Sequence, residues 1–246
     1  MSSTVPFGFE RVLPTEKTAK VRDVFERVAS SYDLMNDVMS GGMHRLWKND
    51  LMGHVNKYPG MKMLDVAGGT GDIAFRLLDH VQDGQLTLVD INPEMLKVGR
   101  EKARKNGLYD SIAWVEGDAC ALPIESNTKD LYTIAFGLRN VTDTQAAIDD
   151  AYRVLRPGGQ YLCMEFSHVV LPFLDKIYEK YSFNLIPKFG EWVAKDKDAY
   201  QYLVESIATF PKQEKLAGMI TSAGFDKVSI TNYMGGIVSV HKGWKI

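Results

Sequence analysis

Between residues 60 and 166, short apolar runs alternate with segments of helical periodicity, and this alternation constrains the fold more than any other feature. One of the helical segments, 94–106, ends at Asn106-Gly107, a pair typical of a helix C-terminus. Strands joined by helices of this length form right-handed crossovers, so the pattern predicts a parallel sheet in a doubly wound α/β fold. The predicted strands cover residues 61–67, 86–90, 112–115, 131–136 and 161–166.

Further elements flank this core. Residues 15–56 are predicted to form an N-terminal helical cap, because Val21, Val24, Phe25 and Val28 follow the i, i+3, i+4, i+7 spacing of a helix. Residues 167–210 form an aromatic-rich insertion that we expect to be helical. Residues 211–246 are predicted to contain a final helix (214–223) and an antiparallel pair of strands (227–233 and 236–242). We therefore expect one domain over residues 1–246, with 60–166 as its ligand-binding core.

Composition excludes several classes of protein. The net charge of −2 offers no basic excess for a nucleic-acid partner, and no run of about 18 apolar residues is present to span a membrane. Two isolated cysteines, Cys120 and Cys163, predict reduced, buried thiols rather than a disulfide framework or a zinc site, and no metal site is expected. The N-terminus has no signal peptide or typical transit sequence, which fits either a soluble protein or a mature form without its presequence.

The segment LDVAGGTGD (64–72) joins the first core strand to the next helix, at the edge where such sheets bind ligands. Glycines let the backbone approach a ligand closely, and free N–H groups at a helix start favour an anionic group. The order Asp65-x-Ala67-x-Gly69-x-Gly71 differs from the G-x-G-x-x-G of dinucleotide sites, and the phosphate loop ending Gly-Lys-Ser/Thr is absent. It matches the acidic-first form used for S-adenosylmethionine, whose ammonium an acidic side chain can approach.

Two more acids follow the next predicted strands. Asp90 ends the second strand, where an acid accepts hydrogen bonds from ribose hydroxyls, and Asp118 follows the third strand, within reach of the adenine amine. A lone glycine-rich turn can simply connect a strand to a helix, and a lone Asp can simply cap one, but the combination is specific. The predicted cofactor-binding residues are Asp65, Ala67, Gly69, Thr70, Gly71, Asp90, Ile91, Asp118 and Ala119.

Longer motifs make the chain similar to the ubiquinone/menaquinone-biosynthesis C-methyltransferase family. They are YDLMNDVMSGGMHRLWK (32–48), LDVAGGTGD, VDINPEML (89–96), FGLRNVTD (136–143), RVLRPGG (153–159), YSFNLIPKFGEWVA (181–194) and YQYLVESI (200–207). The resemblance runs from about Phe7 to the C-terminus and is nearer to the mitochondrial branch than to the bacterial one. It implies a class I S-adenosylmethionine-dependent methyltransferase fold, with a mostly parallel seven-stranded sheet, an antiparallel last strand, an N-terminal helical cap and an aromatic-rich helical insertion.

The resemblance also implies a reaction, methylation of a ring carbon of a 2-polyprenyl-6-methoxy-1,4-benzoquinol. The ring becomes more nucleophilic when a phenolic proton leaves, so the protein has to orient it, provide a route for the proton and exclude water. The family pattern suggests that Arg139 and Asn140 grip the quinol oxygens, while Tyr32 and Asp33 close over the cavity. Arginine is a poor proton acceptor, so Arg139 is interpreted as stabilising a phenolate, although a general-base role through water stays open. His44 is another candidate proton carrier.

Simpler readings remain open at this point. Arg139 could only pair with Asp143, and Tyr32 could only pack on the first helix. The aromatic stretch could be core, a groove for an isoprenoid tail, or a surface that contacts a membrane or a partner protein. A demethylmenaquinol or another small molecule could be the acceptor, or the chain could be a structural subunit. A dinucleotide oxidoreductase is disfavoured by the glycine order.

Partners and location follow from the resemblance alone. It implies a polyprenyl benzoquinol substrate, a multi-protein ubiquinone-biosynthesis complex, peripheral membrane contact and a homodimer. The implied location is the mitochondrial matrix, peripheral on the inner membrane, or the cytoplasm for a bacterial member.

Overall fold

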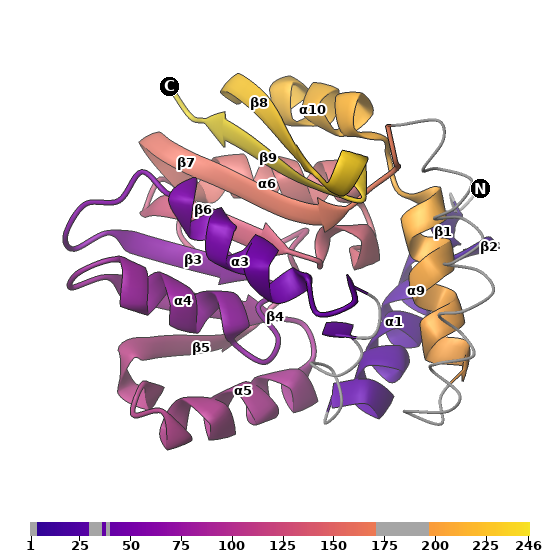
Figure 1. The fold of residues 1–246 in the computed structure, drawn as a ribbon, viewed down its shortest axis with the longest axis horizontal. Helices are drawn as coiled ribbons and strands as arrows, with labels where there is room; N and C mark the ends of the chain where they lie inside the picture. Colours follow the sequence, from indigo (N-terminus) through magenta and orange to yellow (C-terminus); the bar gives the residue numbers. More distant parts are fainter. Residues whose placement is uncertain (1–3, 30–35, 38–39, 171–196) are drawn as a thin grey trace.

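The computed structural model describes residues 4–29, 36–37, 40–170 and 197–246. Within these residues, seven strands form one sheet in the order β5-β4-β3-β6-β7-β9-β8 (Figure 1). Strands β3 to β7 run parallel, whereas β9 is antiparallel to both of its neighbours, β7 and β8. The expected mostly parallel sheet with an antiparallel last strand is confirmed. The strands are β3 (Lys62–Val66), β4 (Gln85–Asp90), β5 (Ile112–Glu116), β6 (Lys129–Ala135), β7 (Leu155–Phe166), β8 (Asp226–Tyr233) and β9 (Val238–Trp244).

Helices bury both faces of this sheet, as a parallel sheet requires. Met63 packs into a core shared with residues of α3 (His44–Gly53), α4 (Asp72–His80) and α5 (Pro93–Lys105). The next residue, Leu64, points to the opposite face and joins a core shared with α6 (Thr144–Val154) and α10 (Gln213–Ser222). This alternation explains why the strands are continuous apolar runs in the sequence.

The helices predicted in the N-terminal segment and after the second core strand are present, and the structure adds a hairpin that was not predicted from the sequence. Within the described part of residues 15–56 lie α1 (Pro14–Val28) and α3, and the predicted helix 94–106 is α5, capped by the Asn92 side chain. Before α1, two short strands, β1 (Val5–Phe7) and β2 (Glu10–Val12), form an antiparallel hairpin. This hairpin packs on α9 (Lys197–Thr209) through the stacked rings of Phe7 and Tyr202, whose centroids are 4.4 Å apart.

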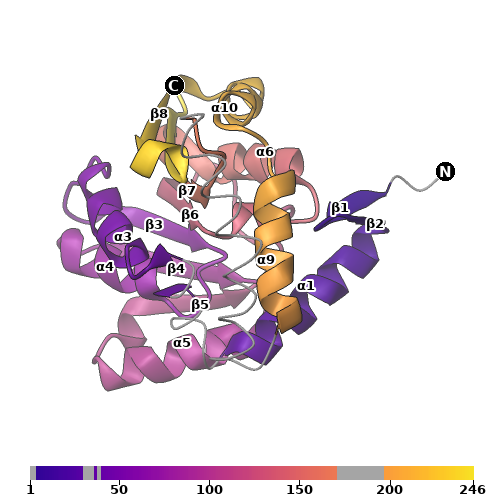
Figure 2. The ribbon, with the colours of Figure 1, turned by 45° about the vertical axis from the view of Figure 1, so that its right-hand side comes forward.

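Helices α1 and α9 stand beyond the carboxyl ends of the parallel strands, where Figures 1 and 2 show them side by side. Within the aromatic-rich stretch, Tyr200, Tyr202 and Phe210 are buried, so this part of it is core. The remaining aromatic residues between 171 and 196 lie outside the described residues. None of the described helices combines the length and apolar character needed to cross a bilayer.

Candidate functional site

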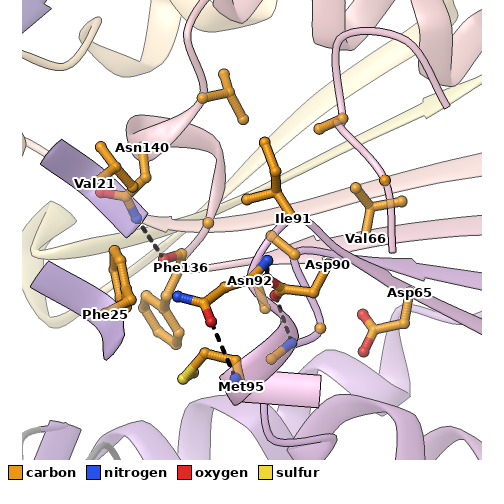
Figure 3. A pocket seen from close by; sticks show the side chains of 18 of the residues that line it. Val21, Phe25, Asp65, Val66, Asp90, Ile91, Asn92, Met95, Phe136 and Asn140 are labelled. Atoms are coloured by element: carbon orange, nitrogen blue, oxygen red, sulfur yellow. Dashed lines mark hydrogen bonds between the residues drawn. The ribbon is translucent and has the colours of Figure 1, made fainter. Parts of the chain in front are cut away.

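A cavity of about 1020 Å³, counting the space at its open mouth, lies at the carboxyl edge of the sheet. Its floor is built from the loops that follow β3, β4, β5 and β6, and α1 forms its opposite wall. Figure 3 shows Val21 and Phe25 of α1 on one side and the carboxylates of Asp65 and Asp90 on the other. This is the edge at which open α/β sheets bind ligands.

The loop after β3 makes a sharp turn into α4. Ala67, Gly69 and Gly71 all have positive φ values, of 51°, 52° and 88°. The absence of a side chain also matters at Gly69, because a Cβ there would lie only 3.0 Å from Met95 Cε. Ala67, Gly69 and Thr70 line the cavity, whereas Gly71 caps the start of α4 and is not among the lining residues described.

Asp65, at the end of β3, is almost completely buried but incompletely bonded. Thr133 Oγ1 donates to its Oδ1 at 2.8 Å, while Oδ2 has no hydrogen-bond partner among the described residues. Burial raises the pKa of Asp65 to about 7, although the hydrogen bond from Thr133 lowers it. The cavity therefore has, at one end, a buried carboxylate oxygen that can accept a hydrogen bond from a ligand.

Asp90, at the end of β4, organises the loop around itself. Its Oδ2 accepts the N–H of Gly69 and its Oδ1 accepts the N–H of Asn92, each at 2.8 Å. Burial raises the pKa of Asp90 to about 6, opposed by these backbone hydrogen bonds. Each carboxylate oxygen has a second lone pair, so Asp90 can still accept from a ligand hydroxyl. Ile91 lines the cavity beside it.

Asp118 follows β5 and also lines the cavity, next to the buried Ala119. Its Oδ1 accepts the N–H of Cys120 at 2.9 Å, and the side chain is partly exposed. Three acids thus lie at the carboxyl ends of β3, β4 and β5, which are neighbours in the sheet. The sequence placed these acids on successive strands, and the sheet order brings them to one cavity.

The two residues predicted after the fourth strand diverge. Asn140 lines the cavity, and its Oδ1 accepts a hydrogen bond from Tyr202 Oη at 3.0 Å. Arg139 is not among the lining residues described, and its guanidinium is buried against Glu165 at the end of β7. Nη1 of Arg139 donates both to Glu165 Oε1 and to the carbonyl oxygen of Phe136, each at 2.6 Å.

This arrangement overturns one sequence-based expectation about Arg139. Pairing with Asp143 is wrong, because the side chain of Asp143 caps α6 by accepting the N–H groups of Gln145 and Ala146. The expected contact of Arg139 with a quinol oxygen stays a prediction; in the described structure its guanidinium pairs with Glu165. Burial raises the pKa of Glu165, and the charge of Arg139 opposes that rise.

Another candidate for proton transfer, His44, lies away from the described lining of the cavity. His44 is buried, its Nε2 lies 2.9 Å from Asp37 Oδ1, and burial lowers its pKa. It is not among the described lining residues. Tyr32 and Asp33 lie outside the described residues, so their expected roles stay predictions.

The cavity includes residues that the sequence interpretation assigned elsewhere or left out. Thr18, Val21, Arg22 and Phe25 of α1 line it, although the apolar spacing of this helix indicated packing alone. Lys48 of α3 lines it too, within a motif that carried the family resemblance but assigned no role to this lysine. A helix that turns one face to a core and the next to a ligand gives no separate signal in its periodicity.

The cysteines are free thiols in the described structure, but only Cys163 is buried, whereas Cys120 is partly exposed. In the part of the chain that is described, no three histidine, cysteine or acidic side chains are grouped as metal ligands.

Comparisons with known proteins agree in one direction. Residues 14–245 match the model of the ubiE/COQ5 methyltransferase family. The chain is 50% identical to the mitochondrial 2-methoxy-6-polyprenyl-1,4-benzoquinol methylase of Arabidopsis thaliana, covering 100% of this chain and 91% of that one. It is 53% identical to the ubiquinone/menaquinone biosynthesis C-methyltransferase UbiE of Brucella canis, covering 98% and 90%.

A solved structure shows the same fold at low identity. Phosphoethanolamine N-methyltransferase 2 of Haemonchus contortus, in complex with S-adenosyl-L-methionine, superimposes with a TM-score of 0.65 at 16% identity. The alignment covers 92% of this chain and 60% of that one.

Proposed function

The chain belongs to the ubiE/COQ5 methyltransferase family, and on this premise we propose that it methylates a ring carbon of a 2-polyprenyl-6-methoxy-1,4-benzoquinol. It is an S-adenosylmethionine-dependent C-methyltransferase of ubiquinone biosynthesis. One structural observation supports the proposed site above the others. Asp65, Asp90 and Asp118 line a single cavity from three neighbouring strands, and Asn140 lies in the same lining.

In this proposal S-adenosylmethionine lies along the cavity, with one acid for each of its polar parts. Asp65 offers its unpartnered Oδ2 to the ammonium, Asp90 its remaining lone pairs to the ribose hydroxyls, and Asp118 a carboxylate oxygen to the adenine amine. Ala67, Gly69, Thr70, Ile91 and Ala119 shape the wall between them, and Gly71 sets the turn into α4. When bound, S-adenosylmethionine supplies an electrophilic methyl group on a positively charged sulfonium.

On the acceptor side, Asn140 is the proposed contact to a quinol oxygen. Tyr202 donates to its Oδ1 and so fixes the amide. Nδ2 donates one N–H to the carbonyl oxygen of Phe136 at 3.5 Å, and its second N–H is the proposed donor to the quinol oxygen. Arg139 acts as a positioning residue in this proposal, because it holds that same carbonyl and thereby shapes the turn before Asn140. Val21 and Phe25 supply an apolar wall that excludes water.

Location and assembly are proposals of a second kind. We propose a mitochondrial matrix enzyme, peripheral on the inner membrane, supported by the 50% identity to the mitochondrial Arabidopsis protein. A polyprenyl substrate partitions into a bilayer, so the enzyme has to meet it there. A bacterial member would occupy the cytoplasm. A homodimer and membership of a multi-protein quinone-biosynthesis complex complete the proposal, and co-fractionation with membranes and with partner proteins tests them.

The reaction is tested with purified protein, labelled S-adenosylmethionine and a short-tailed demethyl benzoquinol kept reduced. Mass spectrometry locates the label on a ring carbon or on an oxygen. We expect ring-methylated product from the wild type, loss of product with Asn140→Ala while calorimetry still detects cofactor binding, and loss of cofactor binding with Asp90→Ala. A demethylmenaquinol run in parallel identifies the preferred acceptor. Cofactor binding without product from either acceptor contradicts the proposed substrate class.

A further inference from the structure

A buried lysine, Lys48, stands at the same end of the cavity as Asp65. It lies on α3, is 4% exposed, and lines the cavity. Its Nζ donates to Asp72 Oδ2 at 2.8 Å and sits over the ring of Phe136, 5.7 Å from the centroid. Its charge also lowers the pKa of Asp65, against the larger effect of burial, so the two side chains are within electrostatic reach.

A buried ammonium is expensive unless its donors are used. Lysine has three donors, and Asp72 accepts one of them while also pairing with Arg76 Nε at 2.9 Å. Burial raises the pKa of Asp72, but Lys48 and Arg76 together lower it below the ordinary value. Asp72 is therefore ionised and shared between two cations, which leaves donor capacity on Lys48 for another acceptor.

Acids and cations lie together at this end of the cavity. Asp65 and Asp72 oppose Lys48 and Arg76, so the group tolerates a ligand head that is itself neutral by carrying both signs. The α-amino acid end of S-adenosylmethionine is such a head, with an ammonium and a carboxylate. Asp65 offers an unpartnered oxygen to the first, and the structure holds a cation nearby for the second. The start of α4, a nine-residue helix, adds a positive pole on the same side.

We propose that Lys48 binds the α-carboxylate of S-adenosylmethionine and, with Asp65, makes the site specific for an intact amino acid end. The inference rests on the proposed placement of the cofactor. This proposal predicts that the enzyme binds more weakly any analogue of S-adenosylmethionine that differs from it only in lacking the carboxylate. A cationic head without a carboxylate adds an uncompensated positive charge beside Lys48 and loses a charge-assisted hydrogen bond.

The test compares S-adenosylmethionine with decarboxylated S-adenosylmethionine, which keeps the ammonium and the sulfonium. Their dissociation constants are measured by calorimetry without an acceptor, so no turnover occurs. We expect the wild type to prefer the carboxylate-bearing ligand. Lys48→Met is expected to weaken that ligand about 10- to 100-fold, the effect of losing one charge-assisted hydrogen bond. The decarboxylated ligand is expected to bind no more weakly than to the wild type, because the variant removes a positive charge beside its ammonium.

Two control variants separate ligand binding from a structural role. Asp72→Asn removes the negative charge that pairs with Lys48 but leaves the positive charge of Lys48 in place. The preference for the carboxylate-bearing ligand is therefore expected to persist in this variant. Lys17→Met removes another buried lysine, one that is not among the described lining residues, and is expected to leave both dissociation constants unchanged. Circular dichroism confirms that each variant is folded.

Several outcomes overturn the inference. If the wild type binds both ligands equally, Lys48 does not read the carboxylate, and this result needs no folded variant. If Lys48→Met weakens both ligands by the same factor, or if Asp72→Asn abolishes the discrimination as Lys48→Met does, Lys48 acts through the structure. If the wild type binds neither ligand, the proposed cofactor site fails, and the inference fails with it.

Discussion

Burial of the Asp65 carboxyl group lowers the stability of the folded protein at neutral and higher pH, and this effect can be measured. The pKa of this carboxyl group rises from 3.8 to about 7 on folding, chiefly through burial. Below pH 3.8 the group is protonated in both states and stability is unaffected. As the pH rises toward 7 the unfolded chain ionises first, so stability falls, and above about 7 the loss is complete. Three pKa units correspond to about 4 kcal/mol, an upper estimate.

We therefore expect Asp65→Asn to stabilise the cofactor-free protein at about pH 8, by up to about 4 kcal/mol. The amide can keep the hydrogen bond from Thr133, and no hydrogen bond to a described residue is lost at Oδ2. The stability advantage should shrink by about 2–3 kcal/mol when the pH is lowered to about 5, because the wild-type carboxyl is then protonated in the folded state.

Urea denaturation followed by circular dichroism measures both free energies of unfolding at each pH. The difference between variant and wild type cancels the titration of those groups that do not interact with Asp65. Asp118→Asn is the matched control, because the carboxyl group of Asp118 is partly exposed and follows β5, the next strand but one from β3. For this control we expect no comparable change, between the two pH values, in the stability difference from the wild type. A stability difference for Asp65→Asn that does not change between the two pH values refutes the reasoning. The same variant is expected to bind S-adenosylmethionine more weakly, because it loses the acceptor for the ammonium.

Two other substitutions test the turns that build the site. Gly137→Ala would place a Cβ 2.5 Å from that of Ala67, so we expect thermal denaturation to show a loss of about 1–3 kcal/mol and calorimetry to show weaker cofactor binding. Gly218→Ala, on an open helix face, should be neutral or slightly stabilising; equal behaviour of the two variants would contradict this. Arg139→Met leaves the Glu165 charge buried and should cost about 3–5 kcal/mol in urea, much of it recovered by adding Glu165→Gln. If Arg139→Met alone is as stable as the wild type, the ion pair with Glu165 does not contribute to stability.

The sheet could be predicted from the sequence because its strands are buried on both faces. Each strand is then an uninterrupted apolar run, and each crossover helix has its own period, so both signals are local. The β1–β2 hairpin escaped because its strands have three residues each and gain their packing from α9, far along the chain. Strands this short have too few residues for an alternating pattern to appear.

The acids of the site were also legible, because a residue directly after a parallel strand has only one edge of the sheet to occupy. The direction of a long side chain is a different problem. In the sequence, Arg139 directly precedes Asn140, which lines the cavity. The position of its guanidinium, however, is determined by Glu165, 26 residues later on the adjacent strand. Lys48 presents the same difficulty, since a lysine on an amphipathic helix ordinarily predicts exposure, and its burial depends on how α3 packs against α4.

The site concentrates unfavourable features at the carboxyl ends of three neighbouring strands, β4, β3 and β6. Ala67 after β3 and Phe136 after β6 both have positive φ values, of 51° and 57°, which cost about 1–3 kcal/mol each for residues other than glycine. Asp65, at the end of β3, and Asp90, at the end of β4, are buried acids with raised pKa values. Helices packed on both faces hold them in place. Because a ligand that satisfies the two acids relieves part of this cost, binding and folding are coupled at this edge, and substitutions that stabilise the free protein here act against cofactor affinity.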